Sequence, residues 1–143
     1  MRRPEVIGRG QRTLAYVIRA DATADTTEFF TPEESAFQAG FVVHEAGGQV
    51  IPHLHLPVER QLAGTSELLL VRSGRCIVDV YDDDRQLVAS RLLGPGDAVL
   101  SVAGGHGFRM LERTVLLEVK QGPYTGATEK ERFPLPLASR EAP

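Results

Sequence analysis

The chain has 143 residues, 42% of them hydrophobic, which is enough for one domain with a sizeable core. Its 16 basic and 19 acidic residues give a net charge of -3 without a basic block, which argues against nucleic acid or an anionic membrane as a partner. Its apolar runs are far shorter than the roughly 20 residues that span a bilayer, so we expect neither a transmembrane segment nor a secretory signal.

The first 36 residues differ in pattern from the rest and are expected to form an N-terminal arm. Residues 13–19 have the β-branched and aromatic composition of a strand, and a polar stretch follows them. Thr31 and Glu34 have the spacing of a capping box, with Pro32 at the first helical position. This pattern predicts one or two helical turns after residue 31.

From residue 37 to about residue 124, short segments rich in Val, Leu and Ile alternate with turn signals such as Ser73-Gly74. Turns at intervals of about 8 to 12 residues between short strands are typical of all-β sandwiches and barrels. The predicted strands are residues 37–44, 49–55, 68–72, 76–81, 87–93, 98–102, 108–111 and 114–120. We therefore expect residues 1–143 to form a single all-β domain, with its core at 37–124 and a short irregular tail at 125–143.

The last predicted strand places two kinds of side chain on opposite faces. Val115, Leu117 and Val119 share a uniformly apolar face, and Glu118 and Lys120 share the other face. We expect the apolar face to pack on the core. Glu118 and Lys120 would then form a solvated or interface pair.

The most informative residues are three of the four histidines and one glutamate. His53 and His55 are two positions apart, so on a strand their imidazoles point to the same face. Glu67 begins a later apolar strand, and His106 follows a Gly-Gly pair. Imidazoles and a carboxylate form a mixed nitrogen and oxygen ligand set for a divalent transition metal. The alternatives are a surface pair of histidines and, for His106, a hydrogen-bonded structural histidine.

The spacing of these residues resembles the first motif of the cupin superfamily. In that motif, Gly is followed after five residues by His-x-His, then by Glu and, after six more residues, by Gly. Gly47, His53, His55, Glu67 and Gly74 keep this order and all but one interval. Between His55 and Glu67, eleven residues stand where the family has three or four.

The second cupin motif is matched only loosely around His106, with Val102 in place of the family's Pro. The segments at residues 64–67 and 118–124 also resemble small single-domain bacterial cupins of the type found near polysaccharide and sugar-nucleotide genes. The resemblance implies a cupin-type double-stranded β-helix, which is a jelly-roll barrel. It also implies one divalent metal, Fe, Mn, Ni or Zn, with His53, His55, Glu67 and His106 as ligands.

The residues between His55 and Glu67 are predicted to form a loop beside this metal. Glu59 lies four residues after His55, closer to the family spacing, and is the alternative carboxylate ligand. Otherwise it is a candidate general acid or base, and Arg60 is a candidate anion-binding residue. We assign Glu59 and Arg60 as candidate catalytic residues, against the alternative of solvated loop side chains.

We therefore expect a cupin metalloprotein that binds or acts on a small polar molecule, for example as an isomerase of a sugar or sugar nucleotide. A metal-dependent dioxygenase of a small organic compound and a non-catalytic ligand-binding or sensor cupin are the alternatives. Cys76 is the single cysteine, so an intramolecular disulfide is excluded, and we expect it to be buried in a cytoplasmic protein. We also expect a homodimer, with residues 13–19 adding to a partner's sheet.

Overall fold

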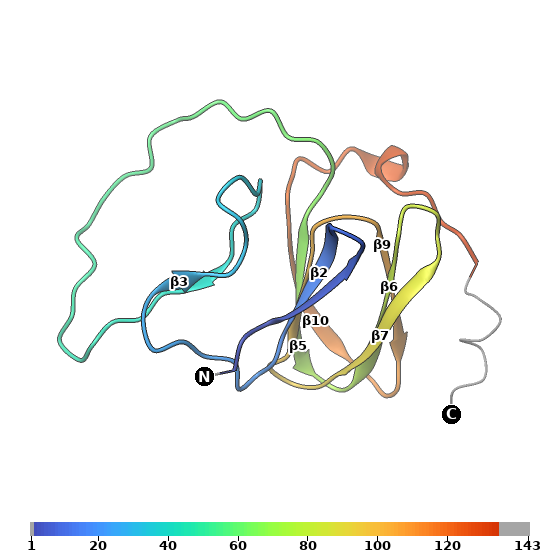
Figure 1. The fold of residues 1–143 in the computed structure, drawn as a ribbon, viewed down its shortest axis with the longest axis horizontal. Coiled ribbons are helices and arrows are strands. Elements are labelled where there is room, and N and C mark those ends of the chain that lie inside the picture. The colour runs from blue at the N-terminus through green and yellow to red at the C-terminus, as the bar shows by residue number, and fades with distance from the viewer. Residues whose placement is uncertain (1, 135–143) are drawn as a thin grey trace.

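The computed structural model of the chain describes residues 2–134, and strands are the main regular structure within them (Figure 1). The elements are β1 (Glu5–Arg9), β2 (Arg12–Ile18), β3 (Glu28–Phe29), β4 (Gly40–Phe41), β5 (Glu67–Ser73), β6 (Cys76–Tyr81), β7 (Leu87–Leu93), β8 (Ala98–Ser101), β9 (Gly105–Met110), β10 (Val115–Lys120) and the short 3-10 helix η1 (Gly126–Glu129). All the described strand pairs are antiparallel, which confirms the prediction of an all-β protein. Within residues 2–134, no helix is long and apolar enough to cross a membrane.

Two antiparallel sheets face each other and hold the core between them (Figure 1). In the described part of the chain, the larger sheet has the strand order β1-β2-β8-β5-β10 and the smaller sheet has the order β7-β6-β9. The short strands β3 and β4 pair with each other as a separate hairpin. Over residues 2–134 the sheets do not join into a closed barrel.

The alternation of side chains along the strands builds the core. On β6, Cys76, Val78 and Val80 are at most 1% exposed, and they pack with Leu69 and Val71 of β5. Burial of such aliphatic side chains stabilises the fold by about 1.5–3 kcal/mol each. The burial of Cys76 agrees with the expectation from sequence.

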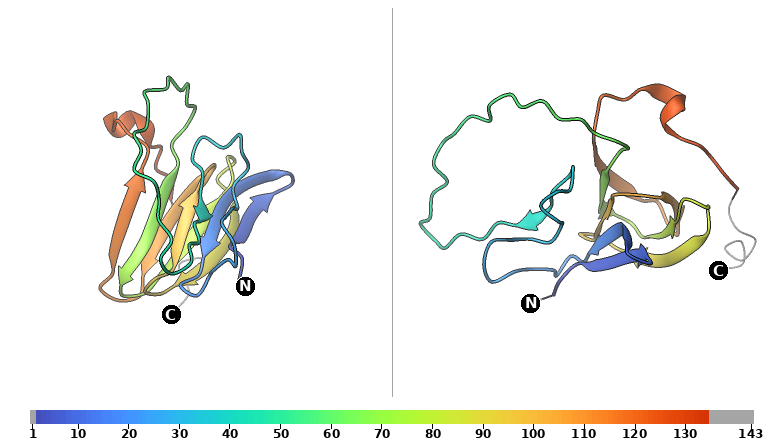
Figure 2. Two further views of the ribbon diagram at one scale, coloured as in Figure 1. Left: turned by 90° about the vertical axis from the view of Figure 1, so that its left-hand side faces the viewer. Right: turned by 45° about the horizontal axis from the view of Figure 1, so that its top comes forward.

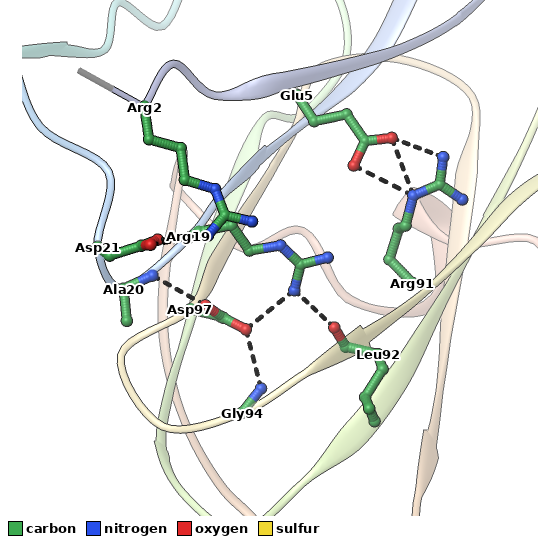
Figure 3. A network of polar contacts seen from close by, with 9 residues as sticks. All are labelled: Arg2, Glu5, Arg19, Ala20, Asp21, Arg91, Leu92, Gly94 and Asp97. Carbon is green, nitrogen blue, oxygen red and sulfur yellow. Dashed lines mark hydrogen bonds and ion pairs between the residues drawn. The ribbon is translucent and has the colours of Figure 1, made fainter.

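One side of the sandwich, where β1 lies beside β7, is closed by polar contacts (Figure 3). Arg91 of β7 donates hydrogen bonds from Nη2 and Nε to Glu5 of β1 at 2.5 and 2.9 Å. Asp97, in the turn before β8, accepts hydrogen bonds from the Arg19 guanidinium at 3.0 Å and from the backbone N–H of Ala20 at 2.8 Å. These contacts hold the end of β2 against the turn between β7 and β8.

The opposite side of the sandwich is open. The strands β9 and β10 follow each other through a short turn, and each is the edge strand of its sheet in the described part of the chain. Residues 42–66 connect β4 to β5 without forming a strand, and they arc away from the two sheets (Figures 1 and 2). We call residues 42–66 the connecting segment.

The connecting segment is where the sequence-based prediction of strands is wrong. The predicted strand at 37–44 is reduced to β4, and residues 49–55 form no strand. A strand is stable only when a neighbour completes its hydrogen-bond ladder. Pro52 within this segment also lacks a backbone donor.

The predicted helical turns after residue 31 are absent, and residues 31–39 form turns and bends instead. The Thr31 hydroxyl accepts a hydrogen bond from the backbone N–H of Ala39 at 2.9 Å, so it closes a loop rather than capping a helix. The following residues have no regular apolar spacing to bury a helical face. Helix nucleation is therefore not offset by packing.

The N-terminal residues are part of the body rather than a free arm. The strand β2 lies between β1 and β8 of the same chain, with Leu14 and Val17 at 1% and 0% exposure. The expectation that residues 13–19 add to a partner's sheet is therefore wrong. Their apolar side chains are buried in the sheet of their own chain.

The faces of β10 are the reverse of those predicted from sequence. Leu117 is 50% exposed and Val119 is 45% exposed. In the register with β5, Glu118 lies opposite Leu69, which is buried in the core. Residues that lie opposite each other point to the same face. Glu118 therefore lies on the inner face of the sheet, where its side chain is still 44% exposed at the open side of the sandwich.

Candidate functional site

Glu67 and His106 meet at one end of the space between the two sheets. Glu67 begins β5 in the larger sheet, and His106 is the second residue of β9 in the smaller sheet. In the register of the smaller sheet, His106 lies opposite Val80, whose side chain is buried in the core. The side chains of Glu67 and His106 thus point inward, towards each other, from facing sheets.

The contacts of this pair are specific. His106 Nε2 lies 3.1 Å from Glu67 Oε2, and His106 Nδ1 lies 3.1 Å from the Ser101 hydroxyl. Lys130 Nζ lies 3.5 Å from the other carboxylate oxygen, Glu67 Oε1. The Glu67 side chain is only 7% exposed, so its carboxylate lies out of bulk water between an imidazole and an ammonium group.

The electrostatics favour a neutral imidazole at His106. Burial lowers the pKa of His106; the Glu67 carboxylate raises it and the Lys130 ammonium lowers it, and the net direction is downward. A neutral imidazole has one donor and one acceptor nitrogen, and the Ser101 hydroxyl can serve either role. In the structure Nε2 of this neutral ring carries the proton and donates to Glu67 Oε2, while Nδ1 accepts from the Ser101 hydroxyl. With a metal at Nε2, the proton would move to Nδ1 and be donated to the Ser101 oxygen, which would keep the ring in the same orientation.

The inner face of β10 adds a second pair of charges near this site. Lys120 lies opposite Glu67 in the register of the larger sheet. Its ammonium group is 3.9 Å from Glu118 Oε1 and 4.2 Å from the ring centre of Tyr124. This end of the interior is therefore polar, whereas the rest is aliphatic.

A cavity of about 740 Å³ opens beside Glu67 and His106. Residues 129–134 line its other wall, and they are held there by Phe133, whose ring packs edge-on against Tyr81 at 5.1 Å between centres. Small-molecule sites commonly have volumes of roughly 300–1,000 Å³. The cavity is therefore large enough for a small polar ligand.

The structure brings together two of the four metal ligands predicted from sequence. His53 and His55 lie exposed on the connecting segment, with 5.0 Å between ring centres, and His53 Nδ1 is 2.9 Å from the carbonyl oxygen of Ile51. Glu59 and Arg60 are also exposed on this segment. Among residues 2–134, no group of three or more His, Cys, Asp or Glu is placed to hold a metal.

Two residues of the site could not be found from sequence patterns. Ser101 ends a buried strand, and Lys130 lies in the segment predicted to be an irregular tail. Their contacts with His106 and Glu67 depend on how distant parts of the chain meet, and no local spacing indicates them. The remainder of the predicted tail, residues 135–143, lies outside the described residues.

Three comparisons with known proteins gave no match: no family model, no curated protein and no solved structure matches the chain. A fold by itself does not determine a function. The function of this chain is therefore inferred from the contacts and chemistry of its own residues.

Proposed function

We infer that the protein is a cupin-type metalloprotein that binds one divalent transition metal at Glu67 and His106 and uses it to bind or transform a small polar molecule. The observation that carries this proposal is the 3.1 Å contact between a buried carboxylate and a neutral imidazole at the edge of a cavity. The resemblance of the sequence to the first cupin motif supports the same pair. It also supports a jelly-roll arrangement of the two sheets.

The donor atoms of Glu67 and His106 are of the types that bind Fe, Mn, Ni or Zn, namely carboxylate oxygen and neutral imidazole nitrogen. Two protein ligands are fewer than the three or more of a typical site. The imidazoles of His53 and His55 are the natural complement, because they are adjacent in space and both exposed. The proposal thus requires the connecting segment to reach the open side of the sandwich.

The position of Glu67 favours it over Glu59 as the carboxylate ligand. Glu67 is buried beside His106, whereas Glu59 is exposed on the connecting segment. Glu59 and Arg60 keep their proposed roles as a proton-transfer group and an anion-binding group on the segment that would cover the ligand.

The residues of the chain have distinct tasks in this proposal. Glu67 supplies negative charge to the metal, His106 supplies a neutral nitrogen, and Ser101 fixes the orientation of the imidazole. Lys130, released from Glu67 by a metal cation, would present its ammonium group to the ligand. The metal would supply Lewis-acid polarisation of a carbonyl or hydroxyl oxygen. This chemistry fits isomerisation of a keto-sugar or a related carbohydrate.

Metal content after purification without chelator tests the proposal. We expect about one ion per chain for the wild type and less than a tenth of that for His53→Ala, Glu67→Gln and His106→Ala, because each loses a bond to the metal. His44→Ala is the matched control, since His44 is the fourth histidine of the chain, is exposed and is not among the proposed ligands.

Further outcomes separate the roles of the residues. Glu59→Gln and Arg60→Ala should keep the metal while weakening ligand binding or turnover of candidate sugars. Loss of metal in Glu59→Gln would instead identify Glu59 as the carboxylate ligand. Equal, sub-stoichiometric metal in the wild type and in His106→Ala would refute the metal site.

A further inference from the structure

The connecting segment exposes a large amount of apolar surface. Seven of its aliphatic side chains are between 43% and 89% exposed: Val42, Val50, Ile51, Leu54, Leu56, Val58 and Leu62. The segment arcs away from the sheets instead of packing on them (Figures 1 and 2). Exposed aliphatic surface of this extent marks an interaction site in soluble proteins.

The open side of the sandwich offers a surface of matching character. On the edge strand β10, the outward side chains Val115, Leu117 and Val119 are 41–50% exposed. At the end of β9 and in the turn after it, Met110 and Leu111 are 51% and 44% exposed. An edge strand can also accept a further strand through its unpaired backbone groups.

We propose that the connecting segment of one copy docks on the open side, along β9 and β10, of a second copy of the chain, and that it brings His53 and His55 to Glu67 and His106 of that second copy. The docking surface follows from the exposed apolar side chains. The shared metal site rests in addition on the proposed function above.

The area is sufficient for a stable dimer. A fully exposed aliphatic side chain presents roughly 60–120 Å² of apolar surface, so the seven side chains together expose on the order of 500 Å². They would cover a similar area on the other copy, and a symmetric pair makes this contact twice. The total is on the order of 2,000 Å², within the range of specific protein interfaces.

A second copy is favoured as the occupant because each chain carries both halves of the contact. A symmetric pair can exchange the two connecting segments and satisfy both apolar surfaces in one closed assembly. The open side also lies close to the two proposed metal ligands. His106 is on the edge strand β9, and Glu67 is on β5, next to the edge strand β10. A segment that docks on the outward face of β10 and continues around this edge strand would reach the open end of the space between the sheets, where Glu67 and His106 point inward.

Light scattering tests the docking surface. We expect the wild type at micromolar concentration to have twice the chain mass of 15.6 kDa, and the double variant Ile51→Asp, Leu54→Asp to be a folded monomer. Val6→Asp is the control, because Val6 is 58% exposed on β1, on the closed side of the sandwich. A monomeric wild type, or a double variant that remains dimeric, would overturn the docking proposal.

Co-expression of two defective chains tests the sharing of metal ligands. One chain carries His53→Ala and His55→Ala, and the other carries Glu67→Gln and His106→Ala. Random pairing makes half of the dimers mixed, and each mixed dimer has one of its two sites complete. The expected metal content is therefore about a quarter of the wild-type value, compared with almost none for either chain alone.

The outcomes are distinguishable from failure of the proposed function. A dimeric wild type that binds metal without recovery in the mixed sample would overturn sharing and place His53 and His55 at the site of their own chain. A dimer that the aspartate substitutions break, but that binds no metal, would refute the metal function while supporting the docking surface.

Discussion

Replacing Arg109 by methionine removes the partner of a fully buried carboxylate. Asp79 on β6 has a side-chain exposure of 0%, and Arg109 on β9 has an exposure of 20%. Arg109 donates two hydrogen bonds to Asp79, from Nε at 2.8 Å and from Nη2 at 3.1 Å. The Ser90 hydroxyl donates a third. Arg109→Met would leave Asp79 buried with only Ser90 to stabilise its charge.

Breaking a buried ion pair by removing one partner costs about 3–5 kcal/mol. Because Arg109 is partly exposed, we expect the lower end, about 3 kcal/mol of the free energy of unfolding. With a urea m-value of about 2 kcal/mol/M, the unfolding midpoint falls by roughly 1.5 M. The control is Arg75→Met, because Arg75 pairs with Glu112 at 3.1 Å but both side chains are about half exposed. That pair contributes less than about 1 kcal/mol.

The pH dependence gives a second criterion. Burial raises the pKa of Asp79, but the hydrogen bonds from Arg109 and Ser90 and the charge of Arg109 lower it, and the net direction is downward. The contribution of the pair is therefore present above the ordinary carboxyl pKa and lost as the pH falls through the lowered pKa of the folded state. Without Arg109, burial favours protonation of Asp79. The deficit of Arg109→Met should thus shrink as the solution is acidified.

Two results would refute this reasoning. The first is a loss of stability at pH 7 no larger for Arg109→Met than for Arg75→Met. The second is a difference between wild type and Arg109→Met that stays constant from neutral to acidic pH. Either would mean that Asp79 is not held as a charged group by Arg109.

Three further predictions concern other buried or sterically restricted residues. Within the described residues the Tyr81 hydroxyl is buried without a hydrogen-bond partner. Tyr81→Phe should therefore leave the free energy of unfolding unchanged or raise it by about 1 kcal/mol in urea titrations. A decrease of more than about 1 kcal/mol would contradict this prediction. Gly104 has φ of 64°, and an added Cβ would lie 2.2 Å from the Tyr81 carbonyl oxygen. Gly104→Ala should therefore cost more than the ~1–2 kcal/mol of a left-handed backbone, whereas Gly10→Ala, with φ of 61° and open space, should cost only that amount. Burial and the charge of Asp97 raise the pKa of the Cys76 thiol, so Ellman's reagent should modify it only when urea unfolds the chain, and rapid modification of the native protein would contradict this.

Most of the strands could be predicted from the sequence because local signals and tertiary pairing agree there. The bounds of β6 and β7 are those expected from the apolar runs between turns. The strand β1 was missed because only Ile7 among its side chains is buried, so its alternation is weak. Its place in the sheet comes from pairing with β2.

The orientation of β10 cannot be predicted from composition alone, because its uniformly apolar face is not the face that packs on the core. The apolar face of Leu117 was expected inside, yet the register with β5 turns Glu118 inward. That register depends on partners more than forty residues away in sequence, such as Leu69. The connecting segment has a strand-like sequence at 49–55 but no neighbouring strand, and the sequence cannot indicate that difference.

The candidate site was predicted in part. Glu67 and His106 were selected as metal-ligand types and do lie together, while the contacts of Ser101 and Lys130 became visible only in the folded chain. The placement of His53 and His55 with them remains a prediction. This placement requires the connecting segment to dock on the sandwich, and the sequence of the segment does not indicate which surface it contacts.

The positions of Glu67 and His106 on different sheets give any bridging ligand a mechanical role as well as a chemical one. The sheets are clamped on one side by Glu5 and Arg91, and they are open on the other. A metal ion held by both Glu67 and His106 would act as a latch on the open side. Metal binding and fold stability would then be thermodynamically linked. Each tenfold rise in free metal concentration above the dissociation constant would add about 1.4 kcal/mol to the free energy of unfolding. The cell's metal supply would thereby set how firmly the two sheets are held together.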